Sequence, residues 1–293
     1  MTTSDIVRRS IEERGVTKSY SIAFSVRCGS TVLSNTLAKY GLGEPTEYFQ
    51  YPYDSSGHID PLKNLASEFV ELVTARARGA IFGSKMTHDH RAHLDGRLAE
   101  SIEGYASVDD VLPDHHWIWL ERRDTVAQAV SWYVAEATDR WHLSAGETTS
   151  LPVSIEYDFF SILTKVMIIG ANHANWQAFF ARQGIEPLTL VYEELVADPL
   201  ASLRAICGHI GVNCEMLTVC LEADGGLVSI ADRSPSVYRE LKERFTDDFM
   251  KIGNSDDRVR LGPSLEKWND FFFGRGWRPR HSSASFVDCQ NAS

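Results

Sequence analysis

The chain has few of the features that mark secreted, membrane-spanning or nucleic-acid-binding proteins. Its 293 residues include five cysteines, an odd number, and no Cys-x-x-Cys pair. A disulfide framework and a cysteine zinc site are therefore both poorly supported. Apolar runs stay well short of the ~20 residues that a membrane-spanning helix needs. We therefore expect no stable membrane insertion.

The amino-terminal segment and the net charge narrow the expected location of the protein and the kind of ligand it can bind. The segment MTTSDIVRRSIEERG is charged throughout and lacks the apolar core of a signal peptide. Together with the cysteine usage this predicts a cytoplasmic protein. The formal net charge is −11, which disfavours the broad cationic surface that nucleic acids require. An anionic ligand would have to be bound by a few local arginines and backbone N–H groups.

Short apolar segments that alternate with helical patterns predict a parallel sheet with helices on both faces. The predicted strands are 19–26, 80–86, 116–121 and 188–192. A long helix is predicted over 155–183, ended by Gly184, and another from Pro199 to about His209 with Asp198 as its N-cap. The predicted fold class is therefore α/β.

The domain organisation follows from length and composition. We expect one α/β domain over 1–273 and a flexible carboxy-terminal tail over 274–293, where the sequence turns basic and then polar. The segment 138–152, rich in Gly, Ser and Thr, is a candidate for a lid or a dimer contact. A homodimer is the expected assembly.

The turn after the first predicted strand combines a cation, a glycine and two hydroxyls. It reads Arg27-Cys28-Gly29-Ser30-Thr31 and leads into a helix. Ligands of open parallel sheets bind at the carboxyl ends of strands, and helix N-termini favour anions. The turn therefore predicts a phosphate or phosphosulfate site. These residues alone leave open an alternative, in which Ser30 caps the helix and Arg27 lies in solvent.

A second cation follows the strand HWIWLE. Arg122 ends that strand, and Ser131 lies on the helix that follows. Two anion sites at neighbouring strand ends suit a nucleoside phosphorylated at both ends. The alternative is an Arg122–Asp124 surface pair and a solvent-exposed serine. The Gly-Lys-Ser/Thr of a Walker A loop is missing, and Asp124 is expected to be an N-cap, which weakens an NTPase interpretation.

Several stretches together resemble a known family. SVRCGSTVL, GEPTEYFQY, FGSKM and ERRDTVAQAVSWYVAEATDRW are similar to the bacterial sulfotransferases typified by mycobacterial trehalose 2-sulfotransferase. The likeness continues more weakly through NWQAFF to PLTLVYEEL and spans roughly 19–245. Cys28 and Arg123 depart from it, since that family more often has serine and proline there. The retained backbone N–H at position 28 suggests that the cysteine matters little.

The resemblance implies 3′-phosphoadenosine 5′-phosphosulfate (PAPS) as the sulfuryl donor. It implies that the turn from Arg27 to Thr31 holds the 5′-phosphosulfate and that Arg122 with Ser131 holds the 3′-phosphate. Arg123 leaves open which arginine makes that contact. The resemblance also assigns Glu47 as the general base that takes the proton of the acceptor hydroxyl.

The acceptor side is less defined by the sequence. Tyr48, Gln50 and Tyr51 offer aromatic faces and an amide that suit a carbohydrate ring, whereas Phe49 is expected to pack inside. Lys85, at the end of the second predicted strand, is expected to contact donor or acceptor, with a solvated lysine as the alternative. The acceptor is therefore expected to be a carbohydrate or glycolipid hydroxyl. We expect no metal, because the ten histidines show no ligand spacing.

Two other functions remain open at this point. One is a kinase with an atypical phosphate loop, which the missing lysine and metal-binding aspartate disfavour. The other is a non-catalytic nucleotide-binding relative, which the retention of Glu47 beside both anion sites disfavours. The main prediction is a PAPS-dependent sulfotransferase.

Overall fold

The computed structural model describes residues 2–49, 65–141, 155–213 and 236–251. It divides after Lys242 into two compact units, 1–242 and 243–293. The first unit holds the sheet and all the site residues discussed below. The predicted domain end at 273 and the predicted tail lie outside the described residues and stay predictions.

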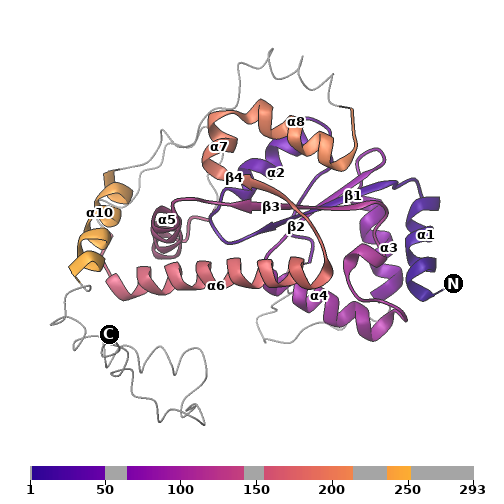
Figure 1. Ribbon diagram of the computed structural model, residues 1–293, viewed down its shortest axis with the longest axis horizontal. Coiled ribbons are helices and arrows are strands. Elements are labelled where there is room, and N and C mark those ends of the chain that lie inside the picture. The colour runs from indigo at the N-terminus through magenta and orange to yellow at the C-terminus, as the bar shows by residue number, and fades with distance from the viewer. Residues whose placement is uncertain (1, 50–64, 142–154, 214–235, 252–293) are drawn as a thin grey trace, which may run out of the picture. The chain divides into compact units, whose positions relative to one another are not determined.

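The centre of the first unit is a four-stranded parallel sheet in the order β2-β1-β3-β4 (Figure 1). The strands are β1 (Lys18–Phe24), β2 (Ile81–Met86), β3 (His115–Glu121) and β4 (Leu188–Val191). Each lies within two residues of its predicted position at either end. The α/β fold with a parallel sheet is therefore confirmed. Because β1 is central, the turn that follows it lies between the carboxyl ends of β2 and β3.

Helices cover both faces of this sheet, as Figure 1 shows for α2, α7 and α8 on one side and α4 and α6 on the other. The described helices of the first unit are α1 (Thr3–Glu13), α2 (Ser30–Lys39), α3 (Leu65–Arg76), α4 (His88–Ser101), the 3₁₀ helix η1 (Val108–Asp110), α5 (Thr125–Thr138), α6 (Phe159–Gln183), α7 (Tyr192–Ala197) and α8 (Pro199–Ile210). The helix α10 (Ser236–Lys251) spans the division between the two units.

Strand periodicity explains the two cores. Tyr20, Ile22 and Phe24 alternate onto the face that packs with Leu33 of α2 and Ile206 of α8. Ala23 of β1 and the tryptophans of β3 face the opposite way, where Trp117 packs against Trp176 of α6 with ring centroids 5.6 Å apart. Side chains of a strand point alternately to the two faces, so both layers of helices bury apolar area against the same strands.

Helix boundaries follow the expected local signals. Gly184 ends α6 in the left-handed conformation, with φ of 67°, as glycine at a helix end commonly does. Asp198 accepts a hydrogen bond from the N–H of Ala201 at 2.9 Å and starts α8, with proline at its first position. Asp124 caps α5 in the same way. The long helix begins at Phe159, four residues later than predicted, because Asp158 supplies its N-cap.

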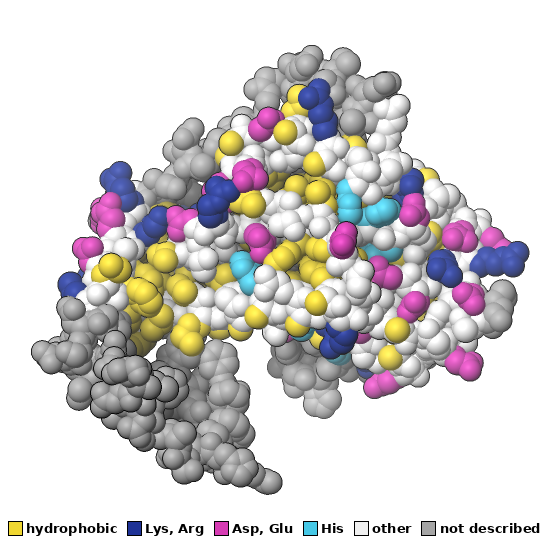
Figure 2. All heavy atoms as spheres, viewed as in Figure 1, with side chains coloured by type: hydrophobic (Ala, Val, Ile, Leu, Met, Phe, Trp, Pro, Cys, Tyr) yellow, Lys and Arg dark blue, Asp and Glu magenta, His cyan; other side chains and the backbone are white. Residues whose placement is uncertain are grey.

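The charged side chains on the face seen in Figure 2 are mixed in sign. Acidic and basic side chains are interspersed over the described part of this face rather than gathered into a cationic field. Within the described residues, no helix is both long and apolar enough to cross a membrane.

Candidate active site

The turn between β1 and α2 is built to expose backbone N–H groups. Arg27 and Gly29 are both left-handed, with φ of 66° and 95°, and such alternation in a turn creates concavities lined by N–H groups that bind anions. α2 starts at Ser30, and its N-cap is Gly29, which supplies no side-chain cap. Ser30 is therefore a helical residue rather than the cap considered as the alternative. The open helix N-terminus favours an anion.

Position 29 needs glycine for two reasons, its left-handed backbone conformation and the lack of space for a side chain. A Cβ atom at this position would lie 2.2 Å from Cδ2 of Tyr192, the first residue of α7. The guanidinium carbon of Arg122 lies 5.1 Å from the centroid of the same ring. Tyr192 thus packs between the turn and Arg122. Tyr192 was not predicted as a site residue, although its place directly after β4 puts it at the same sheet edge.

Arg27 turns its side chain toward the second predicted anion site. Its Nε donates to Ser131 Oγ at 3.1 Å, and its Nη1 donates to the carbonyl of Trp141. Arg122 Nη1 in turn donates to the carbonyl of Arg27 at 3.4 Å. Arg27 and Ser131 were expected to hold opposite ends of the donor, whereas the structure brings the two side chains into contact.

The two guanidinium groups create a local positive field. Burial lowers the pKa of Arg27 below its usual value, with the neighbouring Arg122 charge acting in the same direction. Nε of Arg122 is buried and has no hydrogen-bond partner among the residues that the structure describes. Buried donors are normally satisfied. An anion seated here would relieve both the repulsion and the missing hydrogen bond.

Arg123 takes a different direction from Arg122. Its guanidinium pairs with Glu194 at 2.6 Å, and both side chains are more than 60% exposed. Its backbone N–H donates to Glu193 Oε2 at 3.0 Å. The geometry therefore favours Arg122 as the arginine that serves the turn.

The segment that carries Glu47 is held against the edge strand β2. Tyr20 Oη donates to the carbonyl of Leu42 at 2.7 Å, at the start of the segment. Thr46 then forms a parallel bridge with Ser84, and the N–H of Lys85 donates to the carbonyl of Thr46 at 3.1 Å. Backbone pairing thus places Glu47 beside Lys85.

Lys85 connects Glu47 to the turn. Its Nζ lies 3.2 Å from Glu47 Oε1 and donates to Thr31 Oγ1 at 3.4 Å. The side chain of Lys85 is only 8% exposed and that of Glu47 20%, which excludes the solvated lysine considered as the alternative. The result is a carboxylate and an ammonium group beside the turn that was predicted to bind an anion.

His90 of α4 lies on the other side of Glu47 and was not singled out from the sequence. Its Nδ1 is 4.0 Å from Glu47 Oε2. Burial lowers the pKa of His90 below the usual histidine value, against the opposing effect of Glu47, so its imidazole is mainly neutral at pH 7. His90 is the third residue of α4, and its N–H donates to the side chain of Thr87, the N-cap of the helix.

The neighbours of Glu47 in the segment have partners of their own. Glu44, about half exposed, forms an ion pair with Arg78. Tyr48 stacks on Phe82 with centroids 5.9 Å apart and donates from its hydroxyl to the carbonyl of Glu44. Phe49 stacks on Phe69, which confirms its packing role. A sugar contact by Tyr48 stays a prediction.

Two further predicted acceptor residues, Gln50 and Tyr51, lie outside the described residues. The same holds for the part of the proposed lid beyond Trp141. Their roles stay predictions.

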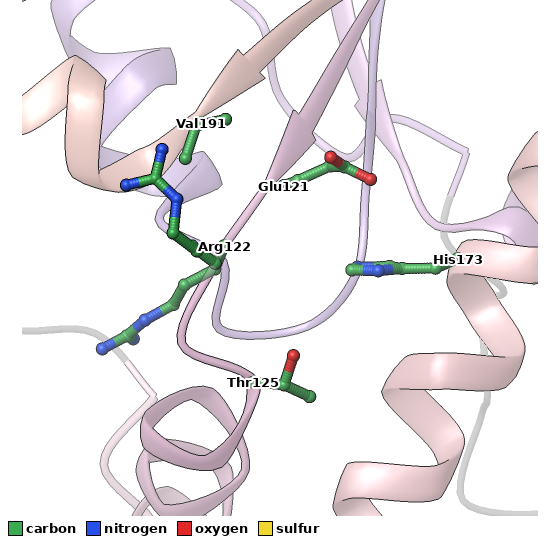
Figure 3. A pocket seen from close by; sticks show the side chains of 6 residues that line it. Glu121, Arg122, Thr125, His173 and Val191 are labelled. Carbon is green, nitrogen blue, oxygen red and sulfur yellow. The ribbon is translucent and has the colours of Figure 1, made fainter.

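A polar pocket opens beside Arg122 (Figure 3). Its volume is about 270 Å³ and it is lined by Glu121, Arg122, Arg123, Thr125, His173 and Val191. In Figure 3 the side chains of Glu121, from β3, and His173, from α6, extend toward the same space. His173 Nε2 also lies 3.3 Å from Ser25 Oγ, just before the turn. Neither Glu121 nor His173 was predicted as a site residue. The helical pattern around His173 does not indicate that this histidine lies near the end of a strand.

The buried thiol of Cys28 and the possible metal ligands remain to be described. Cys28 is fully buried, and burial raises the pKa of its thiol to about 12. Its backbone N–H donates to the carbonyl of Ser25 at 3.2 Å, so the predicted contact of this N–H with a donor stays a prediction. Over the described ranges, no group of three His, Cys, Asp or Glu side chains is placed to hold a metal ion.

Comparisons with known proteins give a consistent picture. The family model described as Stf0 sulphotransferase matches residues 19–245. The chain is 25% identical over 226 residues to the trehalose 2-sulfotransferase of Mycobacterium tuberculosis (strain ATCC 35801 / TMC 107 / Erdman), covering 66% of this chain and 84% of that protein. It is 26% identical over 210 residues to the trehalose 2-sulfotransferase of Mycolicibacterium smegmatis, covering 60% and 78%.

One solved structure is also similar. It is the sulfotransferase domain from the curacin biosynthetic pathway, with a TM-score of 0.36 and 15% identity over 68% of this chain and 75% of that chain.

Proposed function

The chain belongs to the Stf0 sulphotransferase family, and on that premise we propose that it transfers a sulfuryl group from PAPS to a hydroxyl of a carbohydrate or glycolipid. The observation that carries the proposal is the contact of Lys85 with both Glu47 and Thr31. It sets a candidate base directly beside a candidate phosphosulfate turn. The names of the two mycobacterial relatives support a sugar acceptor, with trehalose as the first to test.

The residues at the turn suit a donor that carries phosphate at both ends. The open N-terminus of α2 and the hydroxyls of Ser30 and Thr31 would hold the 5′-phosphosulfate. Arg122, with its unpaired Nε, would hold the 3′-phosphate together with Ser131. Because Arg27 already contacts Ser131, we place its guanidinium in this second site as well.

The donor supplies the sulfuryl group and its leaving phosphate. Glu47 accepts the proton of the acceptor hydroxyl while the new S–O bond forms and the S–O bond to phosphate breaks. Lys85 offers positive charge where negative charge grows on the transferring and leaving oxygens. The fixed distance between Glu47 and the turn holds the reacting atoms in line.

Nucleotide binding tests the donor assignment. The protein should bind 3′-phosphoadenosine 5′-phosphate (PAP) at least about tenfold more tightly than adenosine 5′-phosphate (AMP), because charge-assisted hydrogen bonds contribute about 1.5–3 kcal/mol each. Isothermal titration calorimetry measures both affinities. Equal affinities would refute a PAPS enzyme. Transfer from radiolabelled PAPS to a panel of sugars and glycolipids then identifies the acceptor.

The cytoplasmic location, the homodimer and the absence of nucleic-acid partners remain predictions drawn from the sequence. Analytical ultracentrifugation of the purified chain measures the assembly directly.

A further inference from the structure

Gln128 of α5 is a buried polar residue for which the chemistry above has no role. It is 0% exposed. Its Nε2 donates to Ser25 Oγ at 2.9 Å and to the carbonyl of Val26 at 2.8 Å. Its Oε1 is buried and has no hydrogen-bond partner in the part of the chain that the structure describes. A buried amide whose oxygen has no hydrogen-bond partner costs folding stability. Stability alone therefore does not explain a glutamine at this position, and its contacts with Ser25 and Val26 suggest a further role.

Those contacts lie immediately before the one strained residue of the turn. Arg27 has φ of 66°, a conformation that residues with a Cβ atom adopt only when their surroundings enforce it. Gln128 holds the carbonyl on one side of Arg27, and Arg122 Nη1 donates to the carbonyl of Arg27 itself. The backbone is thus fixed before and after the strained dihedral.

The same helix also fixes the side chain of Arg27. Gln128 and Ser131 are three residues apart and therefore lie on one face of α5. Gln128 binds the backbone that enters the turn, whereas Ser131 accepts a hydrogen bond from Arg27 Nε at 3.1 Å. α5 therefore contacts the strained residue at both its backbone and its guanidinium.

We propose that Gln128 is a positioning residue of the sulfuryl transfer. It holds the Val26 carbonyl so that Arg27 stays left-handed and its guanidinium stays at Ser131, where the 3′-phosphate of the donor binds. The proposal rests on the proposed function, since it assigns the 3′-phosphate to this site. Gln128 itself contacts neither donor nor acceptor. Without it, Arg27 relaxes to an ordinary dihedral and its guanidinium leaves the site.

Two variants remove the amide donor in different ways. Gln128→Met keeps the volume and removes all polarity, and Gln128→Glu keeps the shape while removing the two N–H groups. Gln177→Met, at an exposed position of α6, is the matched control. Calorimetry with PAP and with AMP, alongside thermal unfolding, is measured for all four proteins.

The expected result is a loss of the preference for PAP over AMP. Relative to the wild type, both Gln128 variants should lose at least about tenfold of that preference, as for one lost charge-assisted hydrogen bond. AMP affinity should fall by a smaller factor, because its 5′-phosphate meets the same turn. The control should match the wild type. A merely structural role would weaken both nucleotides together.

Each other outcome overturns the proposal in a distinguishable way. If the wild type prefers PAP and the Gln128 variants keep that preference, only the positioning role fails. If the wild type binds PAP and AMP equally, the proposed function fails and the positioning role with it. If neither variant folds, or if both lose the two nucleotides equally, Gln128 is a structural residue.

Discussion

Replacing Glu47 by glutamine separates catalysis from folding and donor binding. The substitution keeps the size of the side chain and one oxygen that can accept a hydrogen bond from Lys85, but it removes the basic carboxylate. A general base contributes about 10²–10⁴-fold to rate. The turnover number of Glu47→Gln should fall by that factor, while PAP affinity stays within about threefold, because the proposed mechanism has Glu47 contact the acceptor and not the donor.

The cost to stability can be estimated from the ion pair. At the 3.2 Å between Lys85 Nζ and Glu47 Oε1, Coulomb attraction with an effective dielectric constant near 20 amounts to about 5 kcal/mol. The desolvation of two largely buried charges offsets most of it. Since glutamine retains a hydrogen bond to Lys85, we expect a net loss of about 1–3 kcal/mol in the free energy of unfolding. The variant should therefore melt a few degrees lower and remain folded.

Glu44→Gln is the matched control in the same segment. Glu44 pairs with Arg78, and both side chains are about half exposed, so the pair is worth at most about 1 kcal/mol. Its turnover should equal that of the wild type. Turnover is measured with radiolabelled PAPS and the acceptor found in the screen, and affinity by calorimetry. Near-normal turnover of Glu47→Gln would refute the base assignment, and lost PAP binding would make Glu47 a structural partner of Lys85.

Two further predictions concern the turn. Gly29→Ala should unfold at a clearly lower temperature and bind PAP poorly, because its φ of 95° disfavours a Cβ by about 1–2 kcal/mol and the Cβ would meet Tyr192 at 2.2 Å. Gly170→Ala in α6, where an added Cβ meets nothing within 4 Å, is the control, and a Gly29→Ala melting curve that matches the control would contradict the argument. For Cys28, burial raises the thiol pKa to about 12, so the reactive thiolate is scarce at pH 8 and forms only as the pH approaches that value. Mass spectrometry of the Cys28 peptide should show no iodoacetamide labelling of the native protein at pH 8 and rapid labelling in guanidinium chloride; equal rates in both states would disprove the burial of the thiol.

The sequence was sufficient where the signal is local. Short apolar segments located all four strands, and cap residues such as Asp124, Asp198 and Gly184 located helix ends, because each depends on neighbours within a few positions. The turn could be proposed as an anion site for the same reason, whereas Glu47 was assigned as the base by the family likeness.

What the sequence could not show depends on contacts between distant segments. Tyr192, His90 and His173 reach the site only because strand register and helix packing bring them there, and their own neighbours in the sequence carry no sign of it. The direction of Arg27 depends on a left-handed backbone that its residue type does not favour. Predicting that it points to Ser131 requires knowing how α5 docks on the turn.

The bridge between Thr46 and Ser84 has a consequence for how this site can diverge. Main-chain pairing with β2 fixes the segment that carries Glu47, and β1, on the other side of β2, carries the turn. The sheet therefore sets the separation of the two backbones at two strand spacings, about 9.6 Å. Under the proposed function, a change of acceptor specificity therefore need not move Glu47 relative to the turn, because the sheet and not the acceptor-binding side chains sets that separation.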